Sequence, residues 1–389
     1  MKINFKNKKN LLLAVLYVIL FALIIVLIGV TVKSCKAKPT GGENLPVIEE
    51  PENRVSFVGV GDNLIHDAVY IQANRYAGED GVTLEKFDFK PMYKGVEDII
   101  KKADIAYINQ ETMPAGEELG ISSYPLFNSP SQLIYDMRDI GFDVFSQATN
   151  HTFDKTVKGI ENAYNLYQTM KDEVTAVGIY KMGEQNFRSV TKNGIKIGFV
   201  NFTDLTNGFS LPASSKYDVP LSTDEDRIVA DMKYARENCD FLLVLIHWGN
   251  ENHFDISPRQ KELAELFVDG GADAINGTHP HVIQPVEYMG DTLVVYSLGN
   301  FISAQLDKAN MVEGMISFDM VQKGDTKKIE NVKFTPLINY YSSRFRDLQV
   351  MTLADYKTNG KDGTHKLGVT AEYAQKLTEQ IIPAEFLNE

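Results

Sequence analysis

The 389 residues are 44% hydrophobic and 23% charged, which is enough to bury a large core, and the length allows either one large α/β domain or two to three smaller ones. The first 38 residues hold seven lysines and no acidic residue, whereas the rest of the chain carries 32 basic and 52 acidic residues, a formal charge of −20. This acidity argues against nucleic acid as a partner, because that binding depends on Lys and Arg that neutralise phosphates. With only two cysteines, Cys35 and Cys239, a disulfide framework is excluded.

The first predicted element is a membrane-spanning helix. Residues 11–32 form a stretch of 22 residues without a charge, and a helix of that length can cross a hydrocarbon core about 30 Å thick. A cleaved signal peptide would have a shorter apolar region and a small-residue cleavage site. Lipidation of Cys35 is disfavoured, because Lys33 stands where that motif needs a small or apolar residue.

Lysines on the two sides of this span predict its orientation. Four lysines precede it and three follow it, which favours a cytoplasmic tail over residues 1–10 and an extracytoplasmic remainder. Residues 33–53 are rich in Pro, Gly and acidic residues and lack hydrophobic periodicity, which is typical of a flexible linker. We therefore predict a single-pass protein of the cell membrane whose residues 54–389 form an extracytoplasmic domain.

From residue 54 onwards, short apolar runs alternate with amphipathic segments, the pattern of an α/β domain. After residue 310 the pattern becomes that of an antiparallel hairpin that turns near residues 324–325. The predicted strands are RVSFVGVGD (54–62), ADIAYINQE (103–111), FDVFSQATNH (142–151), IKIGFVNFTD (195–204), CDFLLVLIHWGN (239–250), ADAINGTHPH (272–281) and TLVVYSLGNF (292–301).

Two helices are predicted from the residues at their ends. One opens at Ser129, which precedes a proline, and stops at Gly141. The other opens at Ser257, also followed by a proline, and has Gln260 in the position that completes a capping box. Gly270 marks the end of this second helix.

Side chains that can bind a metal lie at the carboxyl ends of the predicted strands. Because ligands bind at the carboxyl ends of strands in open α/β sheets, we expect residues at these ends to converge on one crevice. Carboxylates, imidazoles and an amide suit Mn, Fe or Zn, and the lack of clustered cysteines argues against a structural zinc site. The candidate residues are Asp62, Glu111, Asn150, His151, His247, His279 and His281.

Two of the seven histidines lie on either side of a proline. If the segment is extended, His279 and His281 point to the same face, and Pro280 stiffens the backbone between them. Two imidazoles side by side suit two adjacent metal ions or one shared ion. A polar residue at a strand end is also compatible with a cap or turn role, and we assign His253 and His365 to this structural class.

Six motifs occur in the order GDNLIH, INQE, ATNHTFD, IHWGNENHF, GTHPHVIQPVE and YSLGNF. Over residues 54–304 they resemble the CapA family of bacterial poly-γ-glutamate capsule synthesis, whose domain is similar to the calcineurin-like metallophosphoesterases. A single His-x-His motif would be weak evidence for a family, but six motifs in this order are specific evidence for one. The resemblance implies an α/β fold of the metallophosphoesterase type, a layered sandwich of two β-sheets flanked by helices, here preceded by one transmembrane helix.

The resemblance also implies roles for the candidate residues. Two divalent ions would be bound, one by Asp62 and His281 and one by Asn150, His247 and His279, with Glu111 as the bridge. His151 would be the catalytic residue, either as a general acid or by stabilising charge. Three further residues would line the site: His66, Asn109 and Glu251, of which Glu251 would orient His247.

Two departures from metallophosphoesterases leave the function open. Metallophosphoesterases usually have a histidine two residues after the first Asp, whereas here the nearest histidine after Asp62 is His66. Their bridging residue is an Asp, which Glu111 replaces here. The longer Glu side chain would shift a bound metal, and in-line displacement needs two metals about 3.5–4 Å apart. One hypothesis is a capsule component that binds poly-γ-glutamate during synthesis or export, together with other capsule-synthesis membrane proteins. The other is an extracytoplasmic metal-dependent phosphoesterase or other hydrolase acting on a cell-envelope substrate. The acidic domain would repel a polyanion over about a Debye length, ~8 Å.

Overall fold

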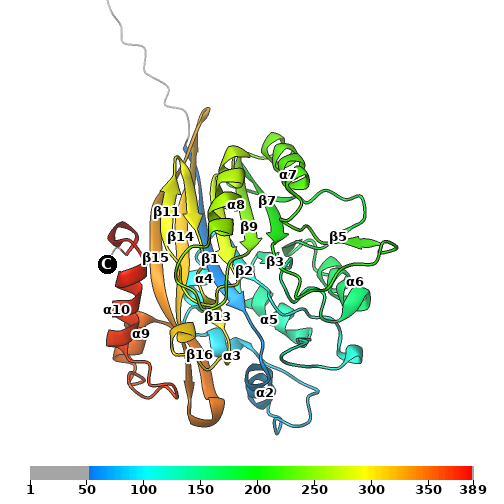
Figure 1. Ribbon diagram of the computed structural model, residues 1–389. Helices are drawn as coiled ribbons and strands as arrows, with labels where there is room; N and C mark the ends of the chain where they lie inside the picture. The colour runs from blue at the N-terminus through cyan, green and yellow to red at the C-terminus, as the bar shows by residue number, and fades with distance from the viewer. Residues whose placement is uncertain (1–51, 388–389) are drawn as a thin grey trace, which may run out of the picture. The chain divides into compact units, whose positions relative to one another are not determined.

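The computed structural model describes residues 52–387. The predicted cytoplasmic tail and membrane span, and the linker up to residue 51, lie outside the described residues and stay predictions. Within residues 52–387, no helix combines the length and the apolar character that a membrane span requires. The described residues form two large β-sheets and a two-stranded ribbon, with helices beside both large sheets (Figure 1).

The larger sheet has eight strands in the order β16-β15-β14-β1-β2-β3-β4, with β13 also paired to β1. Strands β1 to β4 run parallel, whereas β14, β15 and β16 form antiparallel hairpins. The predicted turn at residues 324–325 is confirmed, since it joins paired residues of β14 and β15. The strands are β1 (Glu52–Asn63), β2 (Ile105–Asn109), β3 (Val144–Ser146), β4 (Thr175–Val177), β13 (Asn300–Ile302), β14 (Val312–Lys323), β15 (Thr326–Ser342) and β16 (Arg346–Thr352).

The second sheet has six strands in the order β11-β12-β10-β9-β7-β6, of which β7, β9, β10 and β12 are parallel. Six of the seven predicted segments each contain one strand, whereas the segment 292–301 is divided between β12 and β13, which belong to different sheets. The strands of this sheet are β6 (Arg188–Lys192), β7 (Ile195–Thr203), β9 (Phe241–His247), β10 (Ala274–Thr278), β11 (Val286–Met289) and β12 (Thr292–Val295), and the ribbon consists of β5 (Tyr180–Lys181) and β8 (Tyr217–Asp218).

Helices cover the outer sides of the sheets. In Figure 1, α7 and α8 lie beside β7 and β9, and α9 and α10 lie beside β15. The α-helices are α2 (Asp67–Tyr76), α3 (Lys90–Tyr93), α4 (Glu97–Ile100), α5 (Gln132–Ile140), α6 (Thr156–Gln168), α7 (Glu225–Glu237), α8 (Pro258–Asp269), α9 (Leu353–Thr358) and α10 (Ala371–Ile381). Short 3₁₀ turns are η1 (Glu117–Leu119), η2 (Ala309–Met311), η3 (Ser343–Phe345) and η4 (Ala384–Phe386).

The ends of the two predicted helices agree in part with the structure. Ser257 and Gln260 form the capping box of α8, as predicted. Helix α5 ends at Gly141, which adopts a left-handed conformation with φ 117°. The start of α5 at Gln132 lies three residues after the predicted start at Ser129, whose hydroxyl, the group that would cap the helix, donates instead to Oγ1 of Thr112 at 2.8 Å.

Strand β9 shows why this sheet has an uninterrupted apolar sequence. Leu243 and Leu245 belong to the largest apolar cluster, which also contains Val60 of β1 and so joins the two sheets. Leu242 and Val244 point the other way, into the cluster that α7 and α8 cover. Because successive side chains of a strand alternate between faces, a strand buried on both faces needs apolar residues at every position. The predicted sandwich of two sheets flanked by helices is therefore confirmed.

Gly61 allows β1 to bring Asp62 to the edge of the sheet. The backbone N–H of Asp62 donates to the carbonyl of Gly299 at 3.0 Å. A Cβ atom on Gly61 would lie 1.9 Å from that same carbonyl oxygen, far inside van der Waals contact. The backbone fixes the position of a Cβ atom, and the oxygen belongs to the backbone, so no side-chain rotation can relieve such a clash.

We expect Gly61→Ala to lower the free energy of unfolding by about 3 kcal/mol, the upper end of the range for overpacked cores. Gly360→Ala is the matched control, because Gly360 has open space around it and only a positive φ of 78°. That control should lose about 1 kcal/mol from the left-handed conformation alone. Urea denaturation of both variants measures the difference, and equal losses would contradict the role assigned to the Gly61–Gly299 contact.

Candidate metal centre

The carboxyl ends of strands from both sheets meet at the candidate site. Asp62 is the penultimate residue of β1 and is paired with Asn109, the last residue of β2. His247 ends β9 and is paired with Thr278, which ends β10. The remaining candidates follow these strands within a few residues: Glu111 after β2, Asn150 and His151 after β3, and His279 and His281 after β10. The seven candidate side chains are all buried.

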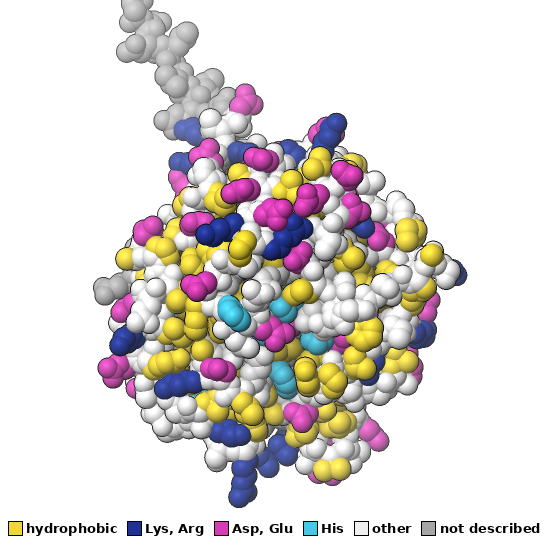
Figure 2. Space-filling model, in the orientation of Figure 1, with side chains coloured by type: hydrophobic (Ala, Val, Ile, Leu, Met, Phe, Trp, Pro, Cys, Tyr) yellow, Lys and Arg dark blue, Asp and Glu magenta, His cyan; other side chains and the backbone are white. Residues whose placement is uncertain are grey.

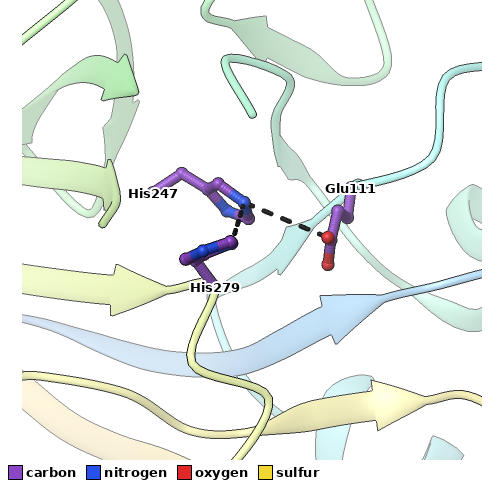
Figure 3. A group of neighbouring side chains, drawn as sticks. All are labelled: Glu111, His247 and His279. Carbon is purple, nitrogen blue, oxygen red and sulfur yellow. Dashed lines mark hydrogen bonds and ion pairs between the residues drawn. The ribbon is translucent and has the colours of Figure 1, made fainter. Parts of the chain in front are cut away.

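Glu111 occupies the middle of this group. Its Oε1 lies 3.7 Å from Nε2 of His281 and 4.0 Å from Nε2 of His247. Figure 3 shows its carboxylate facing the rings of His247 and His279. Two sets of potential ligand atoms therefore share Glu111, and within each set the atoms lie within 4.8 Å of one another: Asp62, Glu111 and His281, and Glu111, His247 and His279.

His247 is held through both of its ring nitrogens. Its Nε2 lies 3.0 Å from Oδ1 of Asn150 and 3.1 Å from Nδ1 of His279. Its Nδ1 lies 3.0 Å from Oγ1 of Thr278. Thr278, not Glu251, is therefore the side chain that orients His247, and this corrects the role predicted for Glu251. The exposed carboxylate of Glu251 instead lies within 4.8 Å of ring nitrogens of His279 and His281.

Asp62 is positioned from three sides. Asn109 donates from Nδ2 to its Oδ1 at 2.7 Å, and Nδ1 of His281 lies 3.0 Å from its Oδ2. The backbone N–H of His279 donates to Oδ2 at 3.2 Å. The hydroxyl of Ser146 donates to Oδ1 of Asn109 at 2.6 Å, which fixes the Asn109 amide with its nitrogen toward Asp62.

The segment that carries His279 and His281 is a turn, which corrects the prediction of an extended segment. Strand β10 ends at Thr278, and the two histidines have φ values of 99° and 58°. The side chain of Asn310 donates to the backbone carbonyl of His281 at 2.9 Å. The backbone N–H of Asn252 donates to the backbone carbonyl of Pro280 at 2.8 Å. Positive φ values in non-glycine residues cost about 1–3 kcal/mol each and cluster at functional sites. The turn brings both imidazoles to the centre, with ring centroids 5.7 Å apart.

His151 lies beside the centre in a pair with Asp154. Its Nδ1 is 2.7 Å from Oδ2 of Asp154, which also accepts the backbone N–H of Phe127 at 2.7 Å. The ring of Phe127 packs edge-on against His151 at 4.7 Å and against His66 at 5.4 Å. Since Asp154 holds Nδ1, Nε2 is the nitrogen of His151 that remains for a substrate.

The other two histidines lie outside these groups. His365 is buried, and its Nε2 lies 3.0 Å from the carbonyl oxygen of Asn339. His253 is exposed, and its Nδ1 lies 2.7 Å from the carbonyl oxygen of Glu251. Neither belongs to a set of potential metal ligands among residues 52–387.

Burial dominates the electrostatics of the centre. It raises the pKa of Glu111 well above its ordinary value, and the charge of Asp62 adds to the effect. Burial and the neighbouring imidazoles lower the pKa of His247 and His279 well below the ordinary value. For His281, burial lowers the pKa, but the charges of Glu111 and Asp62 outweigh it and raise the pKa to about 9.

The residues present fit a divalent cation. Both carboxylate oxygens of Glu111 are buried and have no hydrogen-bond partner among residues 52–387. The lowered pKa values of His247 and His279 keep these imidazoles neutral, so they offer lone pairs. A buried carboxylate is tolerated when it is paired or bound to a metal, and mixed oxygen and nitrogen ligands suit Mn, Fe or Zn.

Comparison with known proteins identifies the family. Residues 56–305 match the family described as bacterial capsule synthesis protein PGA_cap. The chain belongs to this family. PGA_cap relatives include the PGA biosynthesis protein CapA of Bacillus subtilis (strain 168), 32% identical over 170 residues, and the capsule biosynthesis protein CapA of Bacillus anthracis, 29% identical over 182 residues. These matches cover 43% and 46% of this chain and 44% of each relative, so they span less than half of the relatives' length.

Solved structures with a similar arrangement include a phosphatase from Mycoplasma pneumoniae, with a TM-score of 0.45 and 13% identity over 74% of this chain and 95% of that one. A putative 5′-nucleotidase from Staphylococcus aureus has a TM-score of 0.45 and 12% identity over 73% of this chain and 54% of that one. At such scores these likenesses do not extend to the activity of the PGA_cap chain.

The structure of this PGA_cap chain adds functional residues that sequence reasoning missed. Asp154 follows His151 by three residues in the motif NHTFD, so its spacing was visible although its contact was not. Thr278 directly precedes the His-Pro-His segment and is the last residue of its strand. Ser146 gave no sequence signal, because its contact with Asn109 depends on the register of β2 and β3.

We expect Glu111→Gln to weaken Mn²⁺ binding by more than ~100-fold, since even changes to residues that only support metal ligands typically cost about 10–100-fold. Glu313→Gln is the matched control: Glu313 is also fully buried, has no hydrogen-bond partner for either carboxylate oxygen among residues 52–387, and belongs to none of the metal-ligand sets. Calorimetric titration of the metal-free proteins measures both affinities. Equal affinity loss in the two variants, or none in Glu111→Gln, would contradict the assignment.

Proposed function

We propose that the protein is a membrane-anchored, extracytoplasmic hydrolase of capsule biosynthesis that cleaves a phosphate ester with two divalent ions, Mn, Fe or Zn. The observation that carries the proposal is Glu111, a buried carboxylate shared by the sets around Asp62 and His281 and around His247 and His279. The family assignment supports a role in capsule biosynthesis. Two divalent ions at this place would supply Lewis acidity and neutralise charge on the phosphoryl oxygens.

The protein's own residues supply the proton. Asp154 holds Nδ1 of His151 at 2.7 Å, so the ring presents Nε2 to the leaving oxygen. A protonated imidazole in that position gives a proton to the leaving alkoxide, which is the role of a general acid. Asp154 is a positioning residue here, because it acts on the substrate only through His151.

A second candidate function is binding of poly-γ-glutamate without catalysis, in assembly or export with other capsule-synthesis membrane proteins. The observation that favours it is the name of the B. subtilis relative, a PGA biosynthesis protein. Against it stands the charge, because 52 acidic residues face only 32 basic ones after residue 38. A polyanion is repelled by such a domain at short range.

His151→Ala should keep the metal content of the wild type but lower phosphoester turnover, by ~10²–10⁴-fold on the usual scale of general acid catalysis. Glu111→Ala should lose metal and turnover together. His253→Ala is the control, because His253 is exposed and lies outside the metal-ligand sets. The measurements are metal per chain and hydrolysis of phosphoester and γ-glutamyl substrates. Metal-loaded wild type that cleaves neither substrate, with His151→Ala still restoring capsule in a deletion strain, would leave the binding function standing.

The membrane topology has its own test. The uncharged residues 11–32, with four lysines before them and three after, support an extracytoplasmic domain. Protease added to intact cells should therefore digest the region after residue 53. Protection of this region in intact cells, with digestion after lysis, would place the domain in the cytoplasm.

A further inference from the structure

Exposed hydrophobic side chains border the candidate centre on the side of His151. Nine large hydrophobic residues are exposed among residues 52–387, and Tyr124 and Leu126 are two of them, with exposed fractions of 76% and 41%. Both stand just before Phe127 in the chain, and the ring of Phe127 packs against His151 at 4.7 Å and against Tyr124 at 6.4 Å. We refer to Tyr124 and Leu126 as the apolar rim. Figure 2 shows hydrophobic and acidic side chains beside histidines near the middle of one face. Exposed hydrophobic groups that adjoin a candidate site can contribute to ligand binding.

His66 lies beside the loop that carries the rim. The ring of His66 packs edge-on against Phe127 at 5.4 Å, next to Leu126 in the chain. The backbone N–H of Ala304 donates to Nδ1 of His66 at 3.3 Å. Because the same Phe127 ring packs against His151 at 4.7 Å, His66 lies at the border of the centre. Burial lowers the pKa of His66 to about 4.

Hydrogen bonds at its base fix the loop that presents Tyr124 and Leu126. The backbones of Ser122 and Asn128 exchange two hydrogen bonds, of 3.1 and 3.0 Å. The side chain of Asn128 donates to the backbone carbonyls of Gly116 and Gly120 at 2.7 and 3.0 Å. The hydroxyl of Ser122 donates to the backbone carbonyl of Leu126 at 2.6 Å. The rim is thus held in place before a ligand arrives, which lowers the entropy lost on binding.

The loop is tied to the proton donor by one carboxylate. Oδ2 of Asp154 accepts the backbone N–H of Phe127 and lies 2.7 Å from Nδ1 of His151. The ring of Phe127 then lies between His151, at 4.7 Å, and Tyr124, at 6.4 Å. A leaving group that takes its proton from His151 therefore lies next to Phe127 and the apolar rim.

Charge disfavours an anionic leaving group at this place. In the described part of the chain, the polar contacts of the candidate ligands and of His151 involve no Lys or Arg. The exposed carboxylate of Glu251 adds negative charge next to His279 and His281. A leaving group that carries carboxylates would meet repulsion here without a compensating cation.

We propose that the rim binds the leaving group of the substrate, and that this group is an uncharged aliphatic alcohol, so that the substrate is a phosphate monoester of such an alcohol. The inference rests on the phosphoester hydrolysis proposed above. Hydrolysis joins a water oxygen to phosphorus and breaks the bond from phosphorus to the ester oxygen. The ester oxygen leaves with a proton from Nε2 of His151, the imidazole regains a proton from the attacking water through solvent, and the products are the alcohol and inorganic phosphate.

The test compares propyl and hexyl chains, on phosphonates for binding and on phosphate esters for turnover. The two leaving alcohols have nearly equal acidity, so a difference between them reports contact with the chain and not chemistry. Each fully buried methylene strengthens binding by ~4-fold. We expect the metal-loaded full-length protein to bind hexylphosphonate about 10-fold more tightly than propylphosphonate, as measured by calorimetry, since the rim buries the chain only in part.

The variants locate this preference. Tyr124→Ser with Leu126→Ser should reduce the hexyl-to-propyl ratio to below about 3, whereas the control Met182→Ser, at a 61% exposed residue after β5, should leave the ratio unchanged. Hexyl preference in binding without hydrolysis of either ester would uphold the rim and overturn the proposed hydrolysis. Hydrolysis of both esters without a hexyl preference, or a preference that survives the double substitution, would overturn the inference.

Discussion

The burial of Glu111 is the constraint on which the rest of the site depends. A carboxylate with both oxygens buried and no hydrogen-bond partner among the described residues is stable only when it is protonated or faces a cation. No Lys or Arg contacts the group in the part of the chain that the structure describes. The protein instead surrounds the carboxylate with imidazoles that burial and mutual repulsion keep neutral, apart from His281. This combination suits a bound divalent ion better than an internal salt bridge.

The packing of the fold offsets the free-energy cost of such a centre. Strand β9 is apolar on both faces, so its end at His247 is anchored by two hydrophobic clusters. Gly61 lets β1 approach the carbonyl of Gly299 closely enough to fix Asp62. The positive φ values of His279 and His281 are held by hydrogen bonds to neighbouring segments. The strain is thus local, and the support for it comes from packing and hydrogen bonds around the centre.

The sequence predicted those features that depend on local patterns. The strands follow from alternating or continuous apolar runs, the hairpin from its turn residues, and the start of α8 from a capping box at Ser257. The meeting of the candidate residues followed from a rule about parallel strands. The turn at His279 could not be predicted, because contacts from Asn252 and Asn310, distant in sequence, decide its backbone conformation. The partner of His247 depends in the same way on the pairing of β9 with β10.

In this protein, one carboxylate, that of Asp154, positions both the proton donor and the loop proposed to recognise the leaving group. Asp154 holds both the imidazole of His151 and the backbone of Phe127, and Phe127 in turn contacts His66 and the ring of Tyr124. A shift of the loop that carries Tyr124 and Leu126 would therefore move Asp154 and change the direction of Nε2 of His151. A leaving group that seats well against the rim would keep the proton donor aligned, whereas one that displaces the loop would misalign it. Specificity would then appear in the rate of the chemical step as well as in binding, because contacts made best in the transition state raise kcat.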